Sequence, residues 1–206
     1  MIGKVLVGIL GMLALLVVAV ATRPSAYHVE RGIEVAAPAE LVFEELNDLR
    51  RFAGVLVLFG TPWEEIDPAM ETVFEGPAAG VGQSYAWNSG KDAGTGRMSI
   101  VESVPGQRVD VMLAFEKPMK STATFELTLA SMPTGARVSW SMSGTHNFAG
   151  KAFGIFMDMD DMLGADIDAG LARLKSVVEA RQASPAAAAA ARSTQDAATP
   201  LEGETK

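Results

Sequence analysis

The chain of 206 residues contains no cysteine, and this absence excludes several kinds of chemistry. Disulfides, thiolate metal sites and a cysteine nucleophile are ruled out, although either redox compartment can host such a chain. Histidine is scarce too: only His28 and His146 occur, and no motif places carboxylates beside them to complete a zinc site. The Gly-x-Ser-x-Gly motif of serine hydrolases is also missing. We therefore predict no metal and no cofactor, and we find no catalytic motif.

Basic residues are outnumbered, with 17 Lys and Arg against 25 Asp and Glu, for a formal net charge of −8. Residues 30–75 hold eleven acidic and three basic side chains, so this stretch alone accounts for the net charge. Because an acidic surface repels phosphate backbones and no stripe of Lys and Arg offsets it, we exclude nucleic acid as a partner. The stretch keeps open a protein-interaction or chaperone-assisting role with a basic partner, whose identity stays unknown.

The N-terminus has a long uncharged run. Lys4 is followed by Val5 to Thr22 without a charge, and a helix of this length spans roughly 27 Å, close to the ~30 Å of a bilayer core. We predict that residues 1–23 are a transmembrane anchor or a signal peptide, with residues 5–22 in the membrane. We favour an anchor with the domain on the extracytoplasmic side. Ala19-Val20-Ala21 fits a cleavage site, so a secreted or periplasmic protein cut after Ala21 is the alternative.

Beyond this run, hydrophobic periodicity predicts one domain over residues 27–182. A strand covers 27–35, and Pro38 opens a helix because proline suits the first helical turn. Short turns then separate six stretches with the alternation of antiparallel strands, at 71–76, 83–89, 94–104, 107–116, 120–131 and 135–144.

The last predicted element is a long helix after Gly150. Its apolar stripe consists of Ile167, Leu171, Leu174 and Val178. Since each strand has one apolar face, the sheet needs a cover, and this helix is the only long element available. Residues 184–206 are rich in alanine and lack aromatic side chains, so we predict a disordered tail.

This order of elements resembles the helix-grip fold of the SRPBCC superfamily, which includes START-type lipid-transfer domains, Bet v 1-like pollen allergens and polyketide cyclases. It is most similar to the membrane-anchored bacterial subgroup. The residues behind the resemblance are Val29-Glu30-Arg31, Ile33, Pro38, Val42-Phe43, Asn47-Asp48-Leu49, Asp67-Pro68, Met70, Gly76-Pro77, Gly80-Val81-Gly82, Tyr85, Trp87, Glu102-Ser103-Val104-Pro105, Lys117-Pro118, Lys120-Ser121-Thr122-Ala123, Val138, Trp140, Met142, Gly144, Phe156-Met157-Asp158-Met159-Asp160, Gly164 and Gly170-Leu171.

The resemblance implies an α+β protein in which an antiparallel sheet of about seven strands wraps around the C-terminal helix. Relatives tend to have a tryptophan-rich stretch after the first helix, whereas Arg50 to Thr61 of this chain is apolar and reaches Trp63 late. We therefore expect the edge of the cavity formed by this segment to differ from the family pattern.

A curved sheet that grips a helix leaves a space that side chains either fill or leave open. We predict a cavity there, whose wall binds a hydrophobic small molecule such as a lipid or aromatic metabolite at a membrane surface. A solidly filled core is the alternative. The predicted ligand-binding residues are Trp87, Met98, Ile100, Phe115, Phe125, Trp140, Met142, Phe153, Phe156 and Met157.

Two polar groups are candidates for the same cavity. Glu102 is in phase with Met98 and Ile100 on its strand, although Pro105-Gly106 follows at once and favours a strand end in water. His146 follows the last strand. With either group, or an aspartate near Asp158, as a base, the domain would be an enzyme of the polyketide cyclase or hydrolase type. Because no catalytic motif accompanies them, we favour ligand binding without catalysis.

Overall fold

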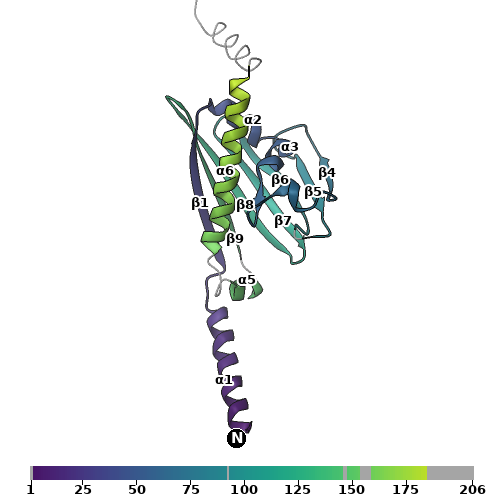
Figure 1. The fold of residues 1–206 in the computed structure, drawn as a ribbon, viewed down its shortest axis with the longest axis vertical. Coiled ribbons are helices and arrows are strands. Elements are labelled where there is room, and N and C mark those ends of the chain that lie inside the picture. Colours follow the sequence, from purple (N-terminus) through teal and green to yellow (C-terminus); the bar gives the residue numbers. More distant parts are fainter. Residues whose placement is uncertain (1, 92, 146–147, 154–158, 185–206) are drawn as a thin grey trace, which may run out of the picture.

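The computed structural model describes residues 2–91, 93–145, 148–153 and 159–184. A seven-stranded antiparallel sheet forms the body of the domain, in the order β1-β9-β8-β7-β6-β5-β4 (Figure 1). Its strands are β1 (Ala26–Val35), β4 (Glu71–Glu75), β5 (Ser84–Asn88), β6 (Thr95–Val104), β7 (Arg108–Lys117), β8 (Ser121–Met132) and β9 (Gly135–Thr145). The alternating stretches of the sequence thus form the predicted strands, and β1 forms one edge of the sheet by pairing with β9.

Short elements connect β1 to the rest of the sheet. They are α2 (Ala39–Leu46), α3 (Leu49–Phe52), the 3-10 turn η1 (Ala53–Val55), β2 (Val57–Leu58), β3 (Thr61–Pro62) and α4 (Trp63–Ile66). Strands β2 and β3 pair as a separate two-stranded hairpin, which the sequence analysis did not predict. Asp48 caps α3, since its side chain accepts a hydrogen bond from the backbone N–H of Arg50.

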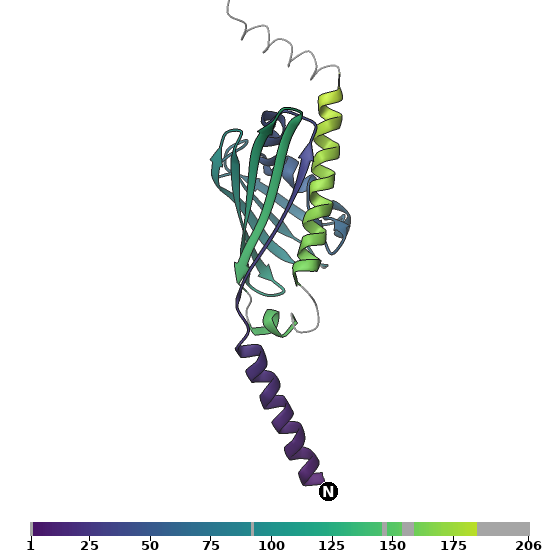
Figure 2. The same cartoon turned by 90° about the vertical axis from the view of Figure 1, so that its left-hand side faces the viewer.

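The long helix α6 (Met159–Ala183) lies along the sheet beside β1 and β9 (Figures 1 and 2). Its predicted stripe of Ile167, Leu171, Leu174 and Val178 is buried against the sheet, with each residue at most 4% exposed. The fold is therefore α+β with the helix-grip arrangement of a sheet and a C-terminal helix. Helix α5 (Phe148–Phe153) precedes α6.

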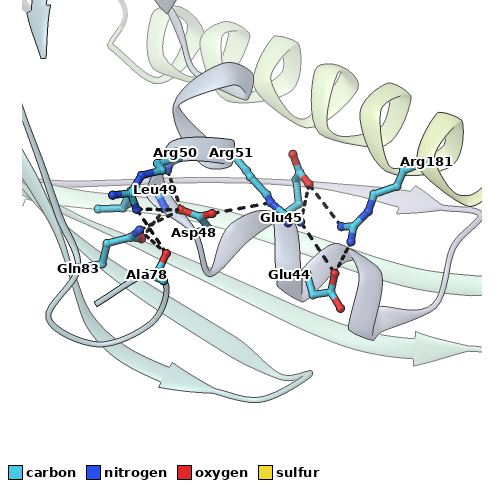
Figure 3. Close-up of polar contacts among 9 residues, drawn as sticks. All are labelled: Glu44, Glu45, Asp48, Leu49, Arg50, Arg51, Ala78, Gln83 and Arg181. Carbon is cyan, nitrogen blue, oxygen red and sulfur yellow. Dashed lines mark hydrogen bonds and ion pairs between the residues drawn. The ribbon is translucent and has the colours of Figure 1, made fainter. Parts of the chain in front are cut away.

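Ion pairs hold the two ends of α6 in place. Near its start, Arg31 of β1 lies 3.1 Å from the Asp160 carboxylate. Near its end, the Arg181 guanidinium pairs with Glu44 and Glu45 of α2, and Arg51 of α3 reaches the same two carboxylates (Figure 3). The helix is thus fastened to the first strand at one end and to α2 at the other.

The apolar N-terminal run forms a helix, α1 (Ile2–Ala21), which extends from the end of the domain where β1 begins (Figure 2). Among the described residues, no helix combines the length and hydropathy required to span a membrane. The anchor or signal peptide expected for residues 1–23 stays a prediction. The tail expected to be disordered lies, apart from Ser184, outside the described residues.

Glu45 gives this fold a testable pH dependence. Burial of its carboxylate raises the pKa of Glu45, and the nearby Arg51 and Arg181 only partly oppose this. The folded state therefore binds this proton more tightly than the unfolded state, so the contribution of Glu45 to stability falls as pH rises through the range above the ordinary glutamate pKa. We expect E45Q to gain stability relative to the wild type between pH 4.5 and 7 in urea titrations. A constant difference between the two proteins across this range would contradict the assignment.

Candidate ligand-binding cavity

A cavity of about 140 Å³ lies between the sheet, the β2–β3 hairpin and the first turns of α6. Its walls are apolar apart from one carboxylate. The lining residues are Leu56, Val57, Leu58, Trp63, Met98, Leu113, Phe115, Phe125, Trp140, Met142, Leu163, Asp166 and Ile167. The volume is similar to that of the ~150 Å³ apolar cavity that holds benzene in an engineered lysozyme.

Strand register brings the sheet side of the cavity together. Met98 of β6 lies opposite Leu113 of β7, and Phe125 of β8 lies opposite Met142 of β9. Because side chains alternate along a strand, Phe115 and Trp140 point to the same face as these neighbours, two residues away. The alternation that predicted the strands therefore also predicts which of their side chains face the cavity.

The hairpin side of the cavity comes from the apolar segment that connects α3 to α4. Leu56, Val57 and Leu58 line the cavity, and Phe59 and Gly60 make the turn with left-handed backbone angles, φ 51° and 73°. Two successive left-handed residues are typical of tight two-residue hairpin turns. The Asp166 carboxylate of α6 accepts hydrogen bonds from the N–H groups of both turn residues, at 2.9 and 2.8 Å. The hairpin thus covers the cavity and is fastened to the helix by one side chain.

The cavity lies at the end of the domain from which α1 extends. Phe115 and Met142 are near the ends of β7 and β9, and Leu163 is in the second turn of α6. The register of β1 with β9 pairs Ala26 with Thr145, so β1 begins at this same end. Helix α1 stops five residues earlier, at Ala21, and Figures 1 and 2 both show it leading away from there.

Of the ten predicted ligand-binding residues, Met98, Phe115, Phe125, Trp140 and Met142 line the cavity. Trp87 and Ile100 are buried but do not line it. Trp87 supports the wall from behind, because its ring packs edge-on against Trp63 and Phe115, at centroid distances of 5.1 and 5.4 Å. The side chain of Phe153, and the whole of Phe156 and Met157, lie outside the described residues. That these residues bind a ligand stays a prediction.

Glu102, a possible polar group of the cavity, does not point inward. Strand register shifts between Ile100 and Glu102, and this irregularity turns Glu102 out of the phase of Met98 and Ile100. Its side chain is 49% exposed and pairs with Arg108 on the neighbouring strand. It therefore has no place in the cavity. His146, the second polar candidate, and Asp158 lie outside the described residues.

Sequence reasoning missed the part of the wall contributed by the hairpin and the helix. Leu163 and Ile167 are four residues apart on α6, and Asp166 lies between them. Extending the apolar stripe of α6 by one turn would have found Leu163. The hairpin residues gave no such signal, because Leu56 to Phe59 is uniformly apolar and shows neither helical nor strand periodicity.

The polar groups around the cavity are mostly satisfied. The Trp63 indole N–H donates to the Tyr85 hydroxyl at 3.0 Å, and burial raises the pKa of Tyr85, so this phenol stays neutral. Both oxygens of Asp166 accept backbone hydrogen bonds. In the described part of the chain, no group of three or more His, Cys, Asp or Glu side chains is arranged to hold a metal ion. The described lining of the cavity is thus almost entirely apolar.

Comparisons with known proteins agree on the fold. No family model and no curated protein matches the sequence. Among solved structures, the chain is similar to StfQ, a di-domain ARO/CYC protein of the steffimycin biosynthetic pathway, with a TM-score of 0.54 and 16% identity over 78% of this chain and 53% of StfQ. It is also similar to CV1439 of Chromobacterium violaceum, with a TM-score of 0.52 and 17% identity over 74% of this chain and 96% of that one.

The solution structure of the Aha1 dimer from Colwellia psychrerythraea is a third similar fold, with a TM-score of 0.50 and 15% identity over 74% of this chain and 96% of that one. Identities this low show the fold alone. The predicted resemblance to SRPBCC domains is thus confirmed at the level of the helix-grip fold. Membership of a membrane-anchored subgroup stays a prediction.

The fastening of the hairpin by Asp166 can be tested by hydrogen exchange. We expect D166A to speed exchange of the Phe59 and Gly60 amides by about tenfold or more, because hydrogen bonds to a charged acceptor are worth about 1.5–3 kcal/mol. The matched control is D168A, which removes an exposed carboxylate from the same helix. If both variants leave the turn amides equally protected, Asp166 does not hold the hairpin.

Proposed function

We propose that this domain binds a small apolar molecule in the cavity between the sheet, the β2–β3 hairpin and α6. The observation that supports the proposal is the cavity itself, about 140 Å³ in volume and lined by aliphatic, aromatic and methionine side chains. Burial of apolar ligand surface supplies affinity of roughly 25 cal/mol per Å². The thioethers of Met98 and Met142 adapt to ligands of different outline.

The size of the cavity selects among the expected ligands. A molecule with one ring, or a short aliphatic chain, fills such a volume. A whole lipid needs more room, because pockets for drug-sized ligands measure about 300–1,000 Å³. We therefore favour a compact aromatic or alicyclic metabolite over a lipid.

Fluorobenzene is a suitable probe, and ¹⁹F NMR measures its binding. L163W should weaken binding at least tenfold, because the larger side chain takes up cavity space from a partly exposed position on α6. The matched control is V177W on the same helix, since Val177 is 43% exposed and far from the cavity along the chain. V177W should bind like the wild type. The absence of saturable binding to the wild-type chain would overturn the proposed function.

We further propose that α1 keeps the domain at a membrane surface. The support is its apolar exterior: Ile9, Leu10, Met12 and Leu15 to Val18 are 44% to 74% exposed, and patches of this kind are rare on soluble monomers. The cavity would then lie at the membrane-facing end of the domain. A domain on the extracytoplasmic side remains our preferred topology.

Charge substitution in α1 tests this second proposal. Leu15 and Leu16 changed together to Lys should move the chain from the membrane fraction to the soluble fraction, because each lysine costs about 2.5–3.5 kcal/mol at the centre of a membrane helix. The control is a pair of lysines at Val73 and Val101, exposed residues of the sheet. If mass spectrometry of the intact protein gives the mass of a chain that starts at Thr22, this would instead support a cleaved signal peptide and contradict the anchor.

The polyketide cyclase or hydrolase alternative receives less support. Among the described lining residues, Asp166 is the one carboxylate, and both of its oxygens are engaged by backbone N–H groups. A general base needs a free acceptor within reach of the substrate. The acidic stretch at 30–75 likewise gives weak support to a protein-interaction role, because several of its carboxylates pair with basic side chains elsewhere in the chain, among them Arg97, Arg173 and Arg181.

A further inference from the structure

The arginines and lysines of the domain differ in their partners. Eight arginines lie between the start of β1 and the end of α6, and each of them pairs with at least one Asp or Glu side chain. Two of the five lysines in the same range are also paired. The other three, Lys117, Lys120 and Lys151, make no ion pair with any residue that the structure describes. In a chain of net charge −8, these cations are available to a negatively charged partner.

The three lysines lie at one end of the domain. Lys117 and Lys120 flank the turn between β7 and β8, and Lys151 is in α5. Strand register places this turn beside the end of β9 and the start of β1. Helix α5 follows β9 in the chain and contacts α1, and Figure 2 shows it between the sheet and the end of α1. The lysines thus gather at the end from which α1 extends.

Exposed apolar side chains accompany the lysines. Met119, in the same turn as Lys117 and Lys120, is 52% exposed, and Phe148 of α5 is 53% exposed. Lysines beside exposed apolar side chains are typical of protein surfaces that rest in the headgroup region of a bilayer. There the apolar groups leave water while the ammonium groups meet lipid phosphates.

The carboxylates in the adjoining segments face other partners. Asp160 and Asp161, in the first turn of α6, both act on the charge of Arg31 on β1, and the Asp160 carboxylate lies 3.1 Å from that guanidinium. Glu116 precedes Lys117 on β7, so its side chain points to the opposite face of the strand, where it lines a hollow on the outside of the sheet. The three lysines therefore keep their charge for a partner outside the domain.

We propose that the end of the domain beside α1 docks on anionic lipid headgroups through a docking surface formed by Lys117, Met119, Lys120, Phe148 and Lys151. This inference rests on the proposed membrane role of α1. Headgroups of negative charge complement the three ammonium groups, and the outer part of the bilayer buries the two apolar side chains.

The short link to α1 favours a bilayer over a soluble polyanion as the partner. Helix α1 ends at Ala21 and β1 begins at Ala26, so the link reaches at most about 18 Å. A bilayer that holds α1 is thus always within reach of the docking surface. The link tethers the domain without fixing its tilt, and contacts between the lysines and the headgroups fix that tilt.

An environment-sensitive fluorophore tests the docking. Because the chain lacks cysteine, M119C provides a single site for an NBD label at the docking surface. V81C provides one in the β4–β5 turn at the opposite end of the sheet, where Val81 is 56% exposed. Both full-length chains are reconstituted into phosphatidylcholine vesicles with or without phosphatidylglycerol.

The label at residue 119 should emit at a shorter wavelength only in vesicles that contain phosphatidylglycerol. High salt should reverse this shift, because salt screens contacts between charges at the surface. The label at residue 81 should keep the emission of an aqueous environment in both kinds of vesicle.

Charge variants of the labelled M119C chain identify the residues responsible. In K120Q/K151Q, which removes one lysine from each element, the ratio of docked to undocked domain should fall about 25-fold, since each lysine near an anionic membrane contributes a factor of roughly five. The matched control is R137Q/K175Q, which removes the same charge at the other end of β1, where both side chains contact Glu34. The control should dock like the unsubstituted chain.

The outcomes separate this inference from the proposed anchor. If the chain floats with both kinds of vesicle and the label at residue 119 emits alike in both, the docking surface is wrong and the anchor stands. Equal loss of docking in R137Q/K175Q would also overturn the inference, because net charge would then be responsible. Salt-sensitive self-association in place of docking, abolished in K120Q/K151Q, would assign the lysines to the acidic side chains of a second copy. If the chain floats with neither kind of vesicle, the proposed role of α1 itself fails.

Discussion

The structure depends on the contact between α6 and the sheet. Four side chains, Ile167, Leu171, Leu174 and Val178, are its buried stripe, and burying each contributes about 1.5–3 kcal/mol. The stripe begins after the first two turns of α6. Beyond that point its side chains fill the space between helix and sheet, and the cavity lies beneath the first turns of the helix. Arg31 and Arg181 hold the ends of the helix, so it spans the cavity without having to fill it.

Much of this fold could be predicted from the sequence because its strands alternate cleanly. Phe115, Phe125, Trp140 and Met142 were placed on the cavity face by that alternation alone. Alternation fails where a strand is irregular, and the register shift after Ile100 is the reason why Glu102 does not share the face of Met98 and Ile100. The β2–β3 hairpin could not be predicted, since its apolar residues show no strand periodicity and the acceptor for its turn, Asp166, is more than a hundred residues away in the chain.

The charges of the acidic stretch at 30–75 also could not be interpreted correctly from the sequence alone. The acidic stretch at 30–75 looks like a docking surface when its residues are counted along the chain. In the folded domain Arg97, Arg173 and Arg181, all from later elements, approach its carboxylates, and Glu45 is buried among such pairs. The excess of negative charge in this stretch therefore arises because many acidic residues lie early in the chain, whereas several of their basic partners lie later.

This order along the chain also bears on how the protein is made. The sheet is complete only when β9 pairs with β1, and the cavity is covered only when α6, the last described element, has been synthesised. During translation the apolar face of the nascent sheet therefore stays uncovered until the final quarter of the polypeptide has left the ribosome. A chain truncated before α6 would present that face to other nascent chains and to chaperones.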